Sequence, residues 1–70
     1  MRYFKLGMEI GQRVKILRLR DRVSAAIAKR LGQTGIIQGY KMTDGGGFGF
    51  VVLFDDNFST WFFDDEIKAV

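Results

Sequence analysis

The sequence contains no cysteine, no histidine and no proline. It therefore has no disulfide bonds, no thiolate or imidazole metal ligands, and none of the Ser-His or Cys-His pairs used in nucleophilic catalysis. Long hydrophobic runs are also missing. The longest nearly unbroken apolar stretch, Phe48–Phe54, is far shorter than the roughly 20 residues of a membrane-spanning helix. The first ten residues lack the pattern of a secretory signal, so we expect a cytoplasmic protein with no cofactor and no metal.

The chain is small and basic, and it is rich in glycine and aromatic residues. The chain has 70 residues, a formal net charge of +3, nine glycines, seven phenylalanines, two tyrosines and one tryptophan. Its 47% hydrophobic content is too high for a disordered linker and suits one small domain. A domain of this size has little room for a catalytic cleft, so we expect no enzyme.

Alternation of apolar and polar residues predicts five short strands, and turn signals separate them. One short helix is predicted in the first long loop, where Ser24 serves as N-cap, Ile27 and Leu31 lie on one side, and Gly32 ends the helix. Lys29 and Arg30 fall in its last turn, beside the negative end of the helix dipole. The predicted strands are Arg13–Leu19, Thr34–Met42, Phe48–Phe54, Ser59–Phe63 and 67–70, with a single helical turn at 64–66.

Five short strands with tight turns indicate an all-β domain, a small partly open five-stranded barrel. We expect two bent sheets packed orthogonally, because a flat sheet of this length encloses too little apolar area. Residues 8–70 form this barrel domain, and residues 1–7 precede it as an N-terminal extension.

Charge is unevenly distributed along the chain. Residues 1–35 carry nine basic and two acidic groups, whereas residues 36–70 carry two basic and six acidic groups. Arg18, Arg20 and Arg22 form a basic loop that, with Lys41, Tyr40 and Phe48, allows an RNA-binding hypothesis. The low net charge and the acidic turns oppose it, and local pairing of these arginines is the simpler interpretation. We therefore expect no nucleic-acid partner.

The segment around Trp61 contains more aromatic surface than one core needs. In a strand, Trp61 and Phe63 lie on one side and Phe62 on the other. Either the N-terminal extension or the helix covers Trp61 and Phe63, or these residues form a contact patch together with Phe58. If these residues form a contact patch, its function is to dock the chain onto a larger protein.

Several strings carry a family resemblance: the segment 10–16 (IGQRVKI), the segment 17–24 (LRLRDRVS), the segment 35–45 (GIIQGYKMTDG) and the segment 54–66 (FDDNFSTWFFDDE). Over residues 8–67 the chain resembles the PetP family, the small peripheral subunits of the cyanobacterial cytochrome b6f complex. The resemblance implies an SH3-like barrel bound at the cytoplasmic side of the thylakoid membrane, modulating photosynthetic electron transport without a redox centre. The E subunit of photosystem I has a similar first strand, which leaves photosystem I as an alternative host.

The sequence thus favours a non-catalytic docking subunit that is a monomer when free. We expect Arg18, Arg20, Arg22 and Lys41 to contact acidic or carbonyl-rich loops of the complex, or anionic lipid headgroups, and Phe58 and Trp61 to supply apolar anchoring. The alternatives are an RNA-binding module and a peripheral subunit of photosystem I.

Overall fold

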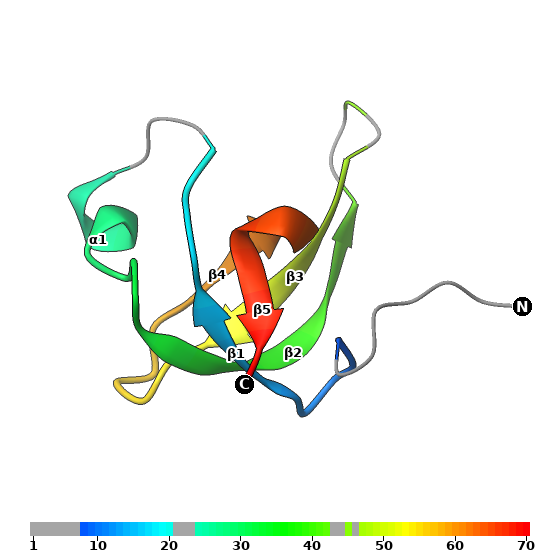
Figure 1. Ribbon diagram of the computed structural model, residues 1–70, viewed down its shortest axis with the longest axis horizontal. Coiled ribbons are helices and arrows are strands. Elements are labelled where there is room, and N and C mark those ends of the chain that lie inside the picture. The colour runs from blue at the N-terminus through cyan, green and yellow to red at the C-terminus, as the bar shows by residue number, and fades with distance from the viewer. Residues whose placement is uncertain (1–7, 21–23, 43–44, 46) are drawn as a thin grey trace, which may run out of the picture.

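The computed structural model describes residues 8–20, 24–42, 45 and 47–70, so the predicted extension 1–7 lies outside the described residues. The described part is mostly β-structure, which confirms the predicted all-β class (Figure 1). Two of the predicted strands and the helical turn at 64–66 have the predicted bounds. The elements in chain order are β1 (Arg13–Ile16), α1 (Ala25–Ala28), β2 (Thr34–Met42), β3 (Phe48–Leu53), β4 (Ser59–Phe63), η1 (Asp64–Glu66) and β5 (Ile67–Ala69).

The strands belong to one antiparallel sheet in the order β4-β3-β2-β1-β5. The expectation of two separate sheets is therefore wrong. A single sheet bends strongly enough to enclose the core, because Phe62 of the edge strand β4 and Ile67 of the edge strand β5 are buried in the same cluster (Figure 1). The two edge strands are not paired with each other, so the barrel is partly open, as predicted.

Alternate residues of each strand enter the core, as the period of two requires. In β1, Val14 and Ile16 are buried, whereas Arg13 and Lys15 are exposed. Burying a side chain such as valine or isoleucine stabilises the fold by about 1.5–3 kcal/mol, so these contacts are the main favourable contribution in so small a domain. The buried apolar residues are Met8, Val14, Ile16, Ile37, Phe50, Val52, Phe54, Phe62 and Ile67.

The first strand is shorter than predicted, because it ends at Ile16 and not at Leu19. Beyond Ile16 the backbone N–H groups of Leu17 and Arg18 donate to the carbonyl oxygen of Glu66, at 2.7 and 3.4 Å, and not to a strand partner. Leu17 is consequently exposed, while Leu19 packs beside the core.

The helix is also shorter than predicted. α1 is a single turn, and Ser24 has the extended backbone of an N-cap but makes no side-chain capping bond. Gly32 has a φ of 86°, the left-handed conformation predicted for it. Arg30 is not in the last helical turn: it is buried against the core, while Leu31 is exposed. Within the described ranges, no helix has the length and hydropathy to cross a membrane.

Strand β2 contains one extra residue, and this decides which side chains face outward. Its pairing with β3 shifts between Ile37 and Gly39, which leaves Gln38 without a partner. Since side chains alternate along a strand, the extra residue exchanges the two faces for the rest of β2. Tyr40 therefore shares a face with the core residue Ile37, and Lys41 lies on the opposite face.

Candidate docking surface

The face of the sheet that points away from the core carries large apolar side chains on three neighbouring strands. Residues paired across strands point to the same side, so the register identifies this face. Ile36 pairs with Leu53, and Val51 pairs with Trp61. All of these side chains are half-buried. We define the outer face as Ile36, Val51, Leu53, Trp61 and Phe63.

Trp61 and Phe63 lie on the outer face and Phe62 lies in the core, as the alternation predicts. The Trp61 and Phe63 ring centroids are 4.9 Å apart with an interplanar angle of 82°. A Cβ atom at Gly49 would lie 2.9 Å from Cε3 of Trp61, so the absence of a side chain there lets the indole approach the backbone of β3. The ring is thus held in place and remains partly exposed.

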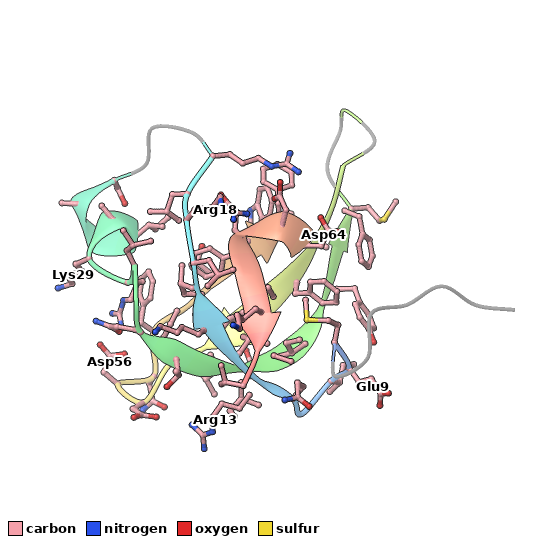
Figure 2. All side chains as sticks on the ribbon, in the orientation of Figure 1. Glu9, Arg13, Arg18, Lys29, Asp56 and Asp64 are labelled. Atoms are coloured by element: carbon pink, nitrogen blue, oxygen red, sulfur yellow. The ribbon has the colours of Figure 1, made fainter. Side chains whose placement is uncertain are left out.

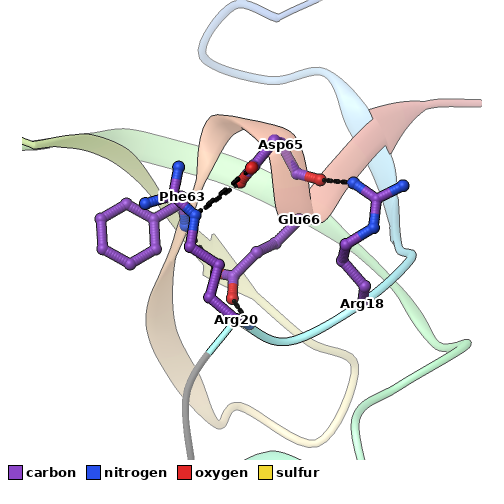
Figure 3. Close-up of polar contacts among 5 residues, drawn as sticks. All are labelled: Arg18, Arg20, Phe63, Asp65 and Glu66. Atoms are coloured by element: carbon purple, nitrogen blue, oxygen red, sulfur yellow. Dashed lines mark hydrogen bonds and ion pairs between the residues drawn. The ribbon is translucent and has the colours of Figure 1, made fainter.

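Arg20, which follows β1, is fixed over this aromatic pair. Its Nε lies 3.0 Å from Oδ1 of Asp65, and its Cζ lies 3.8 Å from the centroid of the Phe63 ring (Figure 3). Arg18 donates from Nη1 to the backbone oxygen of Asp65. The hydrogen bond from Arg20 lowers the pKa of the Asp65 carboxyl and raises the pKa of the guanidinium. Both side chains are about half exposed, so solvent screens this ion pair.

Glu66 joins the loop after β1 to η1 from the inside. Its side chain is buried, at 5% exposure. Oε1 accepts a hydrogen bond from the backbone N–H of Phe63 at 2.7 Å, and Oε2 accepts one from the backbone N–H of Arg20 at 2.6 Å. A buried carboxylate is tolerated when it accepts such bonds. Glu66 therefore holds Arg20 and Phe63 beside each other.

The predicted basic loop is thus not a free cationic patch. Arg18 and Arg20 already contact the acidic turn, while Arg22 lies outside the described residues. The basic first half and the acidic second half of the sequence do not form two separate charged faces, because the fold places Arg18 and Arg20 against η1. Local pairing with Asp21 is not tested, because residues 21–23 lie outside the described residues; the partner that the structure gives Arg20 is Asp65, 45 residues away in the chain.

The remaining predicted contact residues lie in two places. Lys41 is exposed and pairs with Gly49, which pairs in turn with Phe63, so Lys41 flanks the outer face. Phe58 packs beside the core, and its ring lies 4.4 Å from Cζ of Arg30. The structure therefore brings Arg20, Lys41 and Trp61 together and places Phe58 in another cluster.

That second cluster is built around the buried Arg30. Its Nη1 and Nη2 donate to the two carboxylate oxygens of Asp56, at 3.1 and 2.9 Å, and Nη1 also donates to Gln33. The guanidinium lies between Phe54 and Phe58. The hydrogen bond from Arg30 lowers the pKa of Asp56. These contacts hold Arg30 against the core, beyond the end of the helix at Ala28.

Sequence reasoning missed an exposed apolar surface at the end of the β2–β3 hairpin. Met42 is 68% exposed and Ile10 is 59% exposed. Tyr40 and Phe48, which the sequence linked only to RNA, stack with centroids 5.9 Å apart. Their common face depends on the extra residue in β2, which the sequence signals through Gly39, because a glycine inside a strand often marks such a bulge. We define the hairpin surface as Ile10, Tyr40, Met42 and Phe48.

No group of three or more acidic, His or Cys side chains within the described ranges could hold a metal ion. The arrangement offers surfaces for contact, namely the outer face with its flanking cations and the hairpin surface.

Comparisons with known proteins agree with one another. Residues 10–68 match the family model "Cytochrome b6f, subunit Tsr0524-like". The chain is similar to the solution structure of the cyanobacterial cytochrome b6f complex subunit PetP, with 49% sequence identity and a TM-score of 0.84, over 100% of this chain and 92% of that one. It is also 32% identical over 60 residues to the uncharacterized protein ORF65 of Porphyra purpurea, covering 86% of this chain and 92% of ORF65. The fold, the matched segment and the solved relative therefore agree that the chain belongs to the Tsr0524-like family of cytochrome b6f subunits, the family of PetP.

Proposed function

We propose that this chain is a non-catalytic peripheral subunit that docks on the cytoplasmic side of the cytochrome b6f complex and modulates photosynthetic electron transport. The observation that carries the proposal is the outer face, an apolar surface on a rigid sheet with Arg20 and Lys41 at its margin. Membership in a family of cytochrome b6f subunits supports the proposal that this exposed apolar surface is where the larger partner binds.

The outer face has the anatomy of a small protein–protein interface. Interface centres are enriched in tryptophan and phenylalanine, and a polar rim surrounds them. Trp61 and Phe63 are held in fixed orientations by Gly49 and Arg20, so little side-chain freedom is lost on binding. Lys41 stands at the margin and meets acidic or carbonyl groups of the complex, as we also expect of Arg22, while Arg18 keeps its contact with Asp65. Phe58 contributes indirectly, by packing the core under the sheet.

A role without catalysis is supported by the residue inventory. The chain has neither of the side chains, Cys and His, that most often ligate haem or iron–sulfur clusters. Modulation of electron transport then comes from the shape and charge that the subunit adds to the complex. The RNA-binding alternative is weakened because Arg18 and Arg20 are engaged by Asp65.

Co-purification with the complex tests the docking surface. A tagged full-length chain is expressed in a cyanobacterium, thylakoids are solubilised, and retention of the cytochrome b6f complex is compared for Trp61→Ser and Met42→Ser. Both replace a large apolar side chain by serine, the first on the outer face and the second on the hairpin surface. We expect Trp61→Ser to reduce retention at least tenfold and Met42→Ser to leave it within twofold.

Because Trp61 also packs on Gly49, a circular dichroism melt must show that the Trp61→Ser chain is folded. Leu53→Ser, on the same face, serves as a second variant. If Met42→Ser releases the complex while both outer-face variants retain it, the outer face is not the docking surface. If photosystem I co-purifies in place of the cytochrome b6f complex, the proposed host is wrong.

A further inference from the structure

Three cations lie side by side on the outward side of strands β1 and β5, where Arg13 pairs with Ile36 and so borders the outer face. Lys15 pairs directly with Lys68 across the two strands. Arg13 lies two residues before Lys15 and therefore on the same side. All three side chains are exposed, and Arg13 points away from the barrel in Figure 2. We define the basic strip as Arg13, Lys15 and Lys68.

The basic strip carries no compensating acid in the described part of the chain. The ion pairs found there join Arg20 to Asp65 and Arg30 to Asp56, and neither involves the strip. Like charges placed directly opposite each other in a sheet are destabilising. The strip therefore weakens the fold slightly, which is expected of residues kept for contact with something outside the molecule.

Protection of a sheet edge explains only part of this arrangement. β5 is an edge strand, and lysine on an edge strand hinders pairing with other chains. That accounts for Lys68. It does not account for Lys15 and Arg13, because β1 lies inside the sheet between β2 and β5.

The composition of the strip favours a membrane surface over a protein partner. Lysine is depleted in protein interfaces, where arginine and aromatic residues are preferred. Lysine is a compact, strongly hydrated charge on a flexible stem, which suits diffuse attraction to a layer of anionic headgroups. Each such residue near an anionic leaflet is attracted to it, so three together give a weak but useful attraction. A subunit of a membrane complex lies within reach of such a surface.

We propose that the basic strip of Arg13, Lys15 and Lys68 contacts anionic lipid headgroups of the membrane in which the cytochrome b6f complex is embedded. The inference rests on the proposed function, since it requires the protein to sit beside the bilayer. It assigns the lipid contact to β1 and β5, whereas the sequence assigned it to the arginine loop. The outer face is then occupied by the complex and the strip by lipid.

Vesicle flotation with the purified full-length chain tests this assignment. Phosphatidylcholine vesicles are compared with phosphatidylcholine vesicles that contain about 30 mol % phosphatidylglycerol, at low ionic strength, where such attraction is strongest. We expect binding to the phosphatidylglycerol vesicles only. The double variant Lys15→Gln/Lys68→Gln should lower the bound fraction at least fivefold. It should also raise the melting temperature by a few degrees, because the facing charges are removed.

The matched control compares two single variants, Lys15→Gln in the strip and Lys29→Gln outside it, each of which removes one charge from an exposed lysine. We expect Lys15→Gln to lower vesicle binding at least twofold and Lys29→Gln to leave it nearly unchanged. An equal loss in these two variants would mean that net charge alone drives binding, and it would overturn the proposal. So would the absence of binding to phosphatidylglycerol vesicles.

The vesicles contain no cytochrome b6f complex, so a negative result there leaves the docking proposal untouched. If the strip variant instead loses the solubilised complex while the chain never binds vesicles, the strip faces an acidic polypeptide, and the lipid assignment is wrong.

Discussion

Glu66 is the residue on which the geometry of the outer face depends most directly. Its buried carboxylate accepts hydrogen bonds from Phe63 and Arg20, and its backbone oxygen accepts one from Leu17. One residue therefore joins β4, η1 and the loop after β1 (Figure 3). Asp65, its neighbour in the chain, makes the more visible ion pair, but that pair is exposed and screened.

Replacing Glu66 by alanine should destabilise the protein by about 2–4 kcal/mol, because two part-buried backbone N–H groups lose their acceptor. The measurement is urea unfolding followed by the fluorescence of Trp61, which is the single tryptophan of the chain. Asp65→Ala is the matched control, one residue earlier on the same turn, and it should change stability much less. Equal losses in the two variants would show that the surface ion pair, and not the buried carboxylate, holds the loop.

At the scale of elements, local sequence signals predict the C-terminal half of the fold well. Strand β4 lies between a turn, in which Asn57 has a φ of 69°, and an acidic helical turn, so its bounds are determined by neighbouring residues. The errors arise where distant residues decide. The end of β1 is set by hydrogen bonds to Glu66, and the short helix by the pairing of Arg30 with Asp56. Neither partner is visible in a local pattern.

The same distinction applies to the candidate site. Alternation alone correctly separates Trp61 from Phe62, because it needs only the neighbouring residues. It does not place Phe58, which precedes β4 and packs with Arg30. It also fails for the end of β2, since the unpaired Gln38 exchanges the faces of the residues that follow.

Deletion of Gln38 should therefore cost only about 1 kcal/mol, because Ile37 and Gly39 then follow each other directly and keep their partners Val52 and Val51. Tyr40 stays beside Phe50, whose ring centroid now lies 5.5 Å away. Insertion of an alanine after Gly39 should instead destabilise the protein by more than about 2 kcal/mol, because it turns Tyr40 away from Phe50 or forces a second unpaired residue into β2. Guanidinium unfolding of both variants measures the difference. Equal losses in the two variants would mean that β2 needs the Gln38 residue itself and that the faces of the following residues are not set by the count of residues.

At the scale of the whole molecule, the fold redistributes charge. The basic first half and the acidic second half of the chain interleave in one sheet, so the loop arginines meet Asp65 and the uncompensated cations are left elsewhere. Lys41 stands at the margin of the outer face, and Arg13, Lys15 and Lys68 form the basic strip. The proposed attachment to the membrane and its complex therefore has an apolar part, centred on Trp61, and an ionic part supplied by these cations.

The ionic part should make attachment sensitive to salt. In a wash at about 1 M salt the Debye length falls to about 3 Å, so exposed charges no longer attract across the contact. We expect thylakoid membranes washed in this way to lose most of the bound protein, as measured by immunoblotting pellet and supernatant over a series of salt concentrations. The variant Lys15→Gln/Lys68→Gln should already be released at lower salt than the unmodified chain, because fewer charges hold it. The unmodified chain and the variant could both stay bound to the same extent over the whole salt series. That result would mean that apolar contacts alone hold the subunit and that none of these cations takes part.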